Sequence, residues 1–96
     1  MTSKQRAYLR GLANKIDSIF QIGKNGISNN FIVQVNDALE ARELIKLNVL
    51  ETSPEGIQEI ANTLSEATNY ALVQTVGNKI TLYRPRKKNS KIQLPK

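Results

Sequence analysis

The chain has 96 residues, of which 40% are hydrophobic and 23% are charged. This length leaves room for one small globular domain. The sequence contains no cysteine and no histidine, which excludes disulfides, thiolate zinc sites, cysteine nucleophiles and the most common general base. We therefore expect no catalytic residue, no metal site, no cofactor and no small-molecule substrate.

Positive charge is concentrated at the two ends of the sequence. The chain carries 14 Lys and Arg and 8 Asp and Glu, a formal net charge of +6. Residues 1–24 sum to +4, residues 25–78 to −5 and residues 79–96 to +7. A basic excess favours a polyanionic partner such as a nucleic acid. No apolar stretch approaches the ~20 residues of a membrane span and no secretory signal is visible, so we expect a cytoplasmic protein without membrane contact.

The first predicted elements are a helix over residues 3–16 and a short strand over residues 18–22. Thr2 or Ser3 is the predicted N-cap, because its side-chain oxygen can accept an unpaired backbone N–H of the first turn. Four apolar residues share one face of the helix, at i, i+3, i+4 and i+7: Leu9, Leu12, Ala13 and Ile16.

A glycine loop, Gly23-Lys24-Asn25-Gly26, separates this strand from the second predicted helix. Ser28 is the predicted N-cap of that helix. The apolar residues behind it follow the helical period: Phe31, Ile32, Val35, Ala38 and Leu39. The sequence therefore predicts a strand-loop-helix unit.

A second strand and a third helix follow. Residues 43–50 alternate, with one buried face formed by Ile45, Leu47 and Val49. Ser53 is the predicted N-cap of the third helix, with Pro54 at the first helical position. That helix is expected to end at Asn69 or Tyr70.

The predicted domain closes with a hairpin of residues 71–76 and 79–84. Gly77-Asn78 predicts a type II′ turn, because Gly takes positive φ at the first central position. Helices alternating with strands predict an α/β sandwich with a mixed sheet, in the order α-β-α-β-α-β-β. We expect one domain over residues 1–85 and a basic tail over residues 86–96, docked by Ile92 and Leu94.

Two features indicate nucleic-acid binding. Glycines between a strand and a helix N-terminus allow close approach of a phosphate, and Lys24 adds a cation. The alternative is a tight loop with a solvated Lys24. The C-terminal run can neutralise phosphates or act as a solubilising tail; it comprises Arg84, Arg86, Lys87 and Lys88. We expect the two basic ends to converge beside the glycine loop and the acidic middle to face away.

The carboxylates and aromatics predict no further site. Two carboxylate pairs, Glu40 with Glu43 and Glu55 with Glu59, lie at helical spacing and are interpreted as solvated faces. Aromatic residues make up only 5% of the chain, so a stacking platform for bases is not expected, and Tyr8 and Tyr83 are predicted to be packed or half-buried.

Four blocks of the sequence resemble the YhbY family, the stand-alone bacterial form of the CRM domain, named for chloroplast RNA splicing and ribosome maturation. They are residues 2–10, 22–28, 43–46 and 77–84. The resemblance implies a four-stranded sheet similar to the carboxy-terminal domain of translation initiation factor three. It also implies RNA binding and association with precursors of the large ribosomal subunit, as a non-catalytic assembly factor.

Carried over by position, the glycine loop matches the family's G-x-x-G, and Lys4, Arg6 and Arg10 match its basic first helix. The leading hypothesis is a monomeric RNA-binding factor for ribosome assembly, whose predicted RNA-contacting residues are Lys4, Arg6, Arg10, Gly23, Lys24, Asn25, Gly26, Arg84, Arg86, Lys87 and Lys88. The alternative is a structural or protein-interaction module of the ribosome that binds a basic protein through Glu51, Glu55, Glu59 and Glu66. DNA binding is a more distant reading, because no helix-turn-helix or zinc signature is present.

Overall fold

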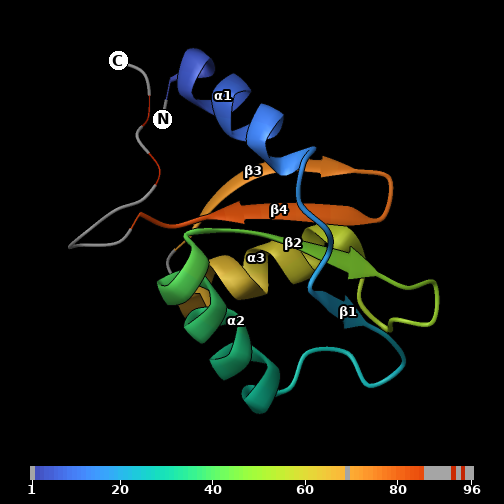
Figure 1. Cartoon of the computed structure of the whole chain (residues 1–96). Coiled ribbons are helices and arrows are strands. Elements are labelled where there is room, and N and C mark those ends of the chain that lie inside the picture. The colour runs from blue at the N-terminus through green and yellow to red at the C-terminus, as the bar shows by residue number, and fades with distance from the viewer. Residues whose placement is uncertain (1, 69, 86–91, 93, 95–96) are drawn as a thin grey trace.

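The computed structural model describes residues 2–68, 70–85, 92 and 94. Within them the elements follow the predicted order α-β-α-β-α-β-β (Figure 1). Their bounds are α1 (Ser3–Ala13), β1 (Phe20–Ile22), α2 (Asn29–Arg42), β2 (Leu44–Val49), α3 (Ile57–Thr68), β3 (Ala71–Val76) and β4 (Lys79–Tyr83).

The strands form one four-stranded mixed sheet in the order β1-β2-β4-β3. β1 runs parallel to β2, while β4 is antiparallel to both of its neighbours. Parallel strands need a long crossover, and α2 provides it between β1 and β2. The predicted α/β class and mixed sheet are therefore confirmed.

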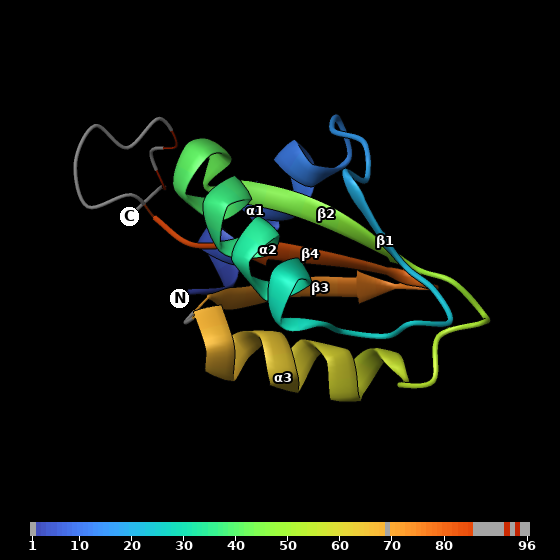
Figure 2. The ribbon, with the colours of Figure 1, turned by 90° about the horizontal axis from the view of Figure 1, so that it is seen from below.

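The sheet is covered by helices on both faces (Figure 2). α2 and α3 pack on the face that carries Ile45, Leu47 and Val49, as the alternation of β2 predicts. The other buried members of this main core are Ile22, Val35, Leu39, Ile60, Leu64, Tyr70, Ile80 and Leu82. On the opposite face α1 buries Leu9 and Ala13 in a second cluster, against Leu44, Val73 and Tyr83.

α1 begins as predicted and ends earlier. The Thr2 side chain accepts a hydrogen bond from the Gln5 backbone N–H, and the Gln5 side chain accepts one from the Thr2 N–H, which forms a capping box. The helix ends at Ala13, so the predicted end at Ile16 is wrong. The strand β1 likewise begins at Phe20 rather than at Ser18. The intervening chain must turn toward the edge of β2, where the Ile19 N–H donates to the Lys46 carbonyl over 2.9 Å.

The start of α3 also differs from the prediction. The Ser53 hydroxyl donates to the Glu55 carbonyl over 2.9 Å instead of accepting a helical N–H. The Ile60 N–H donates to the Gly56 carbonyl over 3.0 Å, so the helix starts at Ile57 and not at Pro54. Pro54 and Glu55 remain in the preceding loop, where both lie close to Gly26.

The hairpin between β3 and β4 has the predicted turn. Val76 pairs with Lys79 across the two intervening residues. Gly77 has a φ of +59°, whereas Asn78 is not among the residues with positive φ, which is the signature of type II′. Beyond the sheet, Ile92 and Leu94 pack against the α1 cluster, as expected.

Glu43 is the largest departure from the sequence interpretation. It follows α2 with a φ of +66° and is fully buried, so its assignment to a solvated face is wrong. Its backbone carbonyl accepts the Arg84 N–H over 2.9 Å, and its Oε2 accepts the Ile92 N–H over 3.1 Å. A non-glycine residue in this conformation costs about 1–3 kcal/mol and persists where its surroundings hold it.

Candidate nucleic-acid interface

The glycine loop forms a tight turn directly after β1, at the start of the connection that leads to α2 (Figure 1). The Gly26 N–H donates to the Gly23 carbonyl over 3.0 Å, which places Lys24 and Asn25 at the central positions of the turn. Both side chains are exposed. Ser28 caps α2 as predicted, its hydroxyl accepting the Phe31 N–H over 3.0 Å. The exposed Lys24 therefore lies in the β1–α2 connection, four residues before this cap.

Gly26 meets two requirements that no larger residue meets without strain. Its φ is +62°, in the left-handed region. A Cβ at this position would lie 2.6 Å from Glu55 Oε1 and 3.1 Å from Pro54 Cγ. The loop therefore packs directly against the segment that precedes α3.

Lys24 has no carboxylate partner within the described part of the chain. The ion pair found there joins Arg84 to Glu40. A phosphate approaching the loop would therefore not compete with an internal ion pair for the Lys24 ammonium group.

The three cations of α1 differ in exposure and in hydrogen bonding. Lys4 and Arg10 are exposed. Arg6 is partly buried, and its Nη1 donates to the carbonyls of Leu72 and Val73 over 2.6 and 3.2 Å. These carbonyls lie at the irregular pairing of the edge strand β3, so Arg6 ties α1 to that edge.

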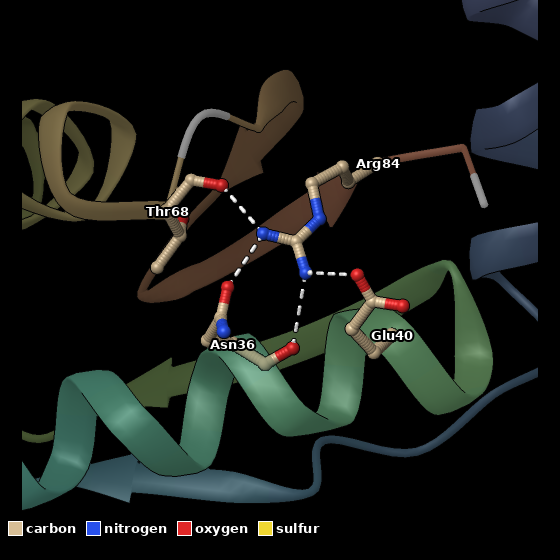
Figure 3. Close-up of polar contacts among 4 residues, drawn as sticks. All are labelled: Asn36, Glu40, Thr68 and Arg84. Carbon is tan, nitrogen blue, oxygen red and sulfur yellow. Dashed lines mark hydrogen bonds and ion pairs between the residues drawn. The ribbon is translucent and has the colours of Figure 1, made fainter. Parts of the chain in front are cut away.

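Arg84 is hydrogen-bonded to the two helices on the opposite face (Figure 3). Its Nη1 donates to Asn36 Oδ1 over 2.6 Å and to the Thr68 carbonyl over 2.7 Å. Its Nη2 donates to the Asn36 carbonyl over 3.1 Å and pairs with Glu40 over 3.4 Å. Only 18% of the Arg84 side chain is exposed, against 69% for Glu40. Arg84 therefore joins the end of β4 to α2 and to the C-terminus of α3.

The structure separates the glycine loop from the cation at the end of β4. Arg84 lies beside Glu43, before the first residue of β2, whereas Gly23 lies beside Leu50 and Thr52, after the last. A strand of six residues spans roughly 20 Å. Arg6 contacts β3 near the end where Ala71 pairs with Tyr83, so it lies toward Arg84. Among the described residues, Arg6 and Arg84 therefore do not converge beside the glycine loop as expected, whereas Lys79 lies at that end of β2, where it pairs with Asn48.

The acidic middle of the sequence does not face away from the loop either, because Glu55 lies against Gly26. The order of acidic and basic segments contained no information on this contact, since it depends on how the β2–α3 loop folds back.

Three predicted residues, Arg86, Lys87 and Lys88, lie outside the described residues.

Tyr83 is 3% exposed and Tyr8 is 42% exposed. Burial, followed by the charge of Glu43, raises the pKa of Tyr83, which keeps its hydroxyl protonated.

Asn36 and Thr68 were not predicted from the sequence as partners of Arg84. They are 48 and 16 positions from Arg84, and no local pattern links them to it.

The described residues contain no group of three or more His, Cys, Asp or Glu side chains that could hold a metal ion. In the same residues, no helix combines the length and the apolar character needed to cross a bilayer.

Known proteins resemble this chain over nearly its whole length. "Probable RNA-binding protein YqeI" of Bacillus subtilis is 45% identical over 95 residues, which covers 99% of each chain. An "RNA-binding protein" of Haemophilus influenzae is 36% identical over 96 residues, covering 100% of this chain and 96% of the relative. The solution structure of SAV1595 from Staphylococcus aureus superposes with a TM-score of 0.80, at 54% identity and 99% coverage of both chains.

Residues 1–84 match the family described as the CRS1 / YhbY (CRM) domain. This range includes the glycine loop and every helix and strand described above. The chain therefore belongs to the CRS1 / YhbY (CRM) domain family.

Proposed function

We propose that this protein is a monomeric, cytoplasmic RNA-binding factor that associates with precursors of the large ribosomal subunit and assists their assembly without catalysing a reaction. The observation that carries the proposal is the exposed Lys24 in the Gly23–Gly26 turn, which has no carboxylate partner among the described residues. Such a turn presents an unpaired cation to a phosphate. The names of the relatives as RNA-binding proteins support the nucleic-acid class.

The proposal assigns phosphate contacts to Lys24, Lys4 and Arg10, whose side chains are exposed. Asn25 and the two glycines shape the turn that Lys24 occupies. Arg6 and Arg84 are expected to act chiefly through the fold, because their guanidinium groups already donate to protein oxygens. Arg86, Lys87 and Lys88 complete the proposed electrostatic footprint.

The test measures binding of transcribed large-subunit ribosomal RNA at several salt concentrations. The logarithm of the wild-type affinity should fall linearly with the logarithm of salt, and Lys24→Ala should reduce the slope by about 0.7–0.9. Arg42→Ala removes the same charge from an exposed site at the end of α2 and is the matched control. Equal affinities of wild type and Lys24→Ala would contradict the assignment of the loop.

The association with precursor subunits is tested by co-sedimentation with assembly intermediates in cell extracts. The alternative, a protein-interaction module, predicts loss of co-sedimentation in Glu59→Lys/Glu66→Lys. These carboxylates are exposed on α3, whereas Glu55 contacts the glycine loop and would confuse the comparison. The proposed function predicts that this variant still co-sediments and that Lys24→Ala is the weaker binder.

A further inference from the structure

One part of the α1 side of the sheet is not covered by α1. Strand pairing places Gln21, Asn48, Lys79 and Val76 in one row across all four strands. The next row contains Lys46, Thr81 and Gln74. We call these residues, without the buried Thr81, the open face. The row after them contains Leu44, Tyr83 and Ala71, and α1 packs on Leu44 and Tyr83 of that row.

The open face has the chemistry of a surface for a polyanion. It contains two lysines, three side-chain amides and Val76, and none of its residues is acidic. Gln21, Lys79 and Val76 are exposed, Val76 to 60%. The chain between α1 and β1 crosses the sheet beside Lys46 (Figure 1), where Ile19 donates to the Lys46 carbonyl. The accessible part of the face therefore lies toward the hairpin.

The open face reaches the same end of the sheet as the glycine loop. Gln21 precedes Gly23 by two residues. The Val49 N–H donates to the Asn78 carbonyl over 2.7 Å, and a Cβ on Gly23 would be 3.5 Å from Leu50. The hairpin turn and the glycine loop thus both adjoin the end of β2, so the row from Gln21 to Lys79 begins next to Lys24.

Lys46 and Lys79 occupy diagonal positions on neighbouring strands, since Lys79 pairs with Asn48. Diagonal neighbours in an antiparallel pair are about 7–8 Å apart. Two cations at this separation can contact neighbouring phosphates of one strand. The exposed Gln21 amide and the partly exposed Gln74 amide can hydrogen-bond the edges of unpaired bases, and Val76 offers an apolar contact to a base.

We propose that the open face binds a single-stranded segment of RNA that continues from the strand held at Lys24. The phosphates contact Lys46 and Lys79, and the bases lie against Val76 and the amides of Gln21 and Gln74. This inference rests on the proposed RNA-binding function. A single strand is favoured over a duplex because a duplex turns its base edges inward, away from side chains on a sheet.

The experiment measures binding of a fluorescent single-stranded RNA pool, twelve nucleotides long with randomised sequence. Lys79→Ala should weaken binding about five-fold and lower the salt slope by about 0.7. Gln21→Glu, which places a carboxylate next to the loop, should weaken it by a similar factor. Arg42→Ala should bind like wild type. Both test residues are exposed, so thermal unfolding of the variants should match wild type.

A second measurement locates the contact independently. Titration of isotopically labelled protein with the same RNA should shift the backbone amide signals of residues 21, 48, 74 and 79. Variants at Lys79 and Gln21 that bind like wild type, while Lys24→Ala binds weakly, would overturn the open-face site and leave the proposed function intact. Tighter binding of a twelve-base-pair duplex than of the single-stranded pool would also overturn the open-face site. So would a protein that binds ribosomal RNA but does not bind the single-stranded pool. A wild-type protein that binds none of these RNAs would overturn the proposed function as well.

Discussion

The carboxylate of Glu55 lies against Gly26, so closely that a Cβ on Gly26 would be 2.6 Å from Glu55 Oε1. This contact joins the loop before α3 to the turn that presents Lys24. It also places the negative charge of Glu55 beside the glycine loop. Two predictions depend on it, one for stability and one for RNA affinity.

Gly26→Ala should lower the free energy of unfolding by about 1–2 kcal/mol, because an L-residue is strained at this positive φ and its methyl group must displace Glu55. Urea denaturation measures the change. Gly11→Ala is the control: Gly11 lies inside α1, and a Cβ added there would have nothing within 4 Å. At that position the substitution should raise stability by about 0.5–1 kcal/mol. Equal effects at both positions would contradict the role of the Gly26 conformation.

Glu55→Gln should increase RNA affinity about two- to five-fold at low salt, because it removes a negative charge beside the Lys24 turn while preserving side-chain shape. The gain should shrink as salt rises. Glu66→Gln removes the same charge from an exposed site near the end of α3. If both variants gain affinity equally, net charge alone explains the effect and the local contact does not.

Arg84→Ala should destabilise the fold by about 2–3 kcal/mol, because it leaves the Asn36 and Thr68 acceptors unpaired in a partly buried site. Arg84→Lys keeps the charge but lacks the planar fork, so it should recover only part of this loss. Glu40→Gln should have little effect, since that carboxylate is largely exposed. Chemical denaturation of the three variants measures the ranking, and an Arg84→Ala protein as stable as wild type would refute the structural role.

Stability should decline in alkaline solution through Tyr70. Its hydroxyl donates to the Ala61 carbonyl over 2.5 Å, and burial raises the pKa of Tyr70 from 10.0 to about 12. The folded state therefore holds this proton more tightly than the unfolded state, so unfolding becomes easier as pH rises from about 10 to 12. Below about pH 10 the Tyr70 hydroxyl is protonated in both states, so this contribution is fully present and the free energy of unfolding does not change with pH through this group.

The measurement is the free energy of unfolding of wild type and Tyr70→Phe as a function of pH. The variant loses the hydrogen bond to Ala61 but also loses the titrating group, so its stability should fall less steeply above pH 10. Ultraviolet titration of the tyrosines should show late ionisation of both Tyr70 and Tyr83 in wild type, and the contribution of Tyr70 should be missing in the variant. Identical slopes for the two proteins would contradict this assignment.

The sequence by itself determined the features that depend on neighbouring residues. The Thr2 and Ser28 caps, the type II′ turn at Gly77 and the alternation in β2 are local, because each needs only a side chain and a backbone a few positions away. Together with the order of elements, they were sufficient to predict an α/β domain with a mixed sheet. The glycine turn was also predictable, because its hydrogen bond joins residues three apart.

The tertiary structure decided what depends on strand order and on returning loops. The register of β2 with β4 places Arg84 beside Glu43, at the opposite end of β2 from the glycine loop, and buries a glutamate that the local pattern assigned to solvent. The loop before α3 brings Glu55 to Gly26, across 29 positions of sequence. A run of charges specifies how many cations are present, but only the packing of distant segments determines which remain free for RNA and which are already hydrogen-bonded within the protein.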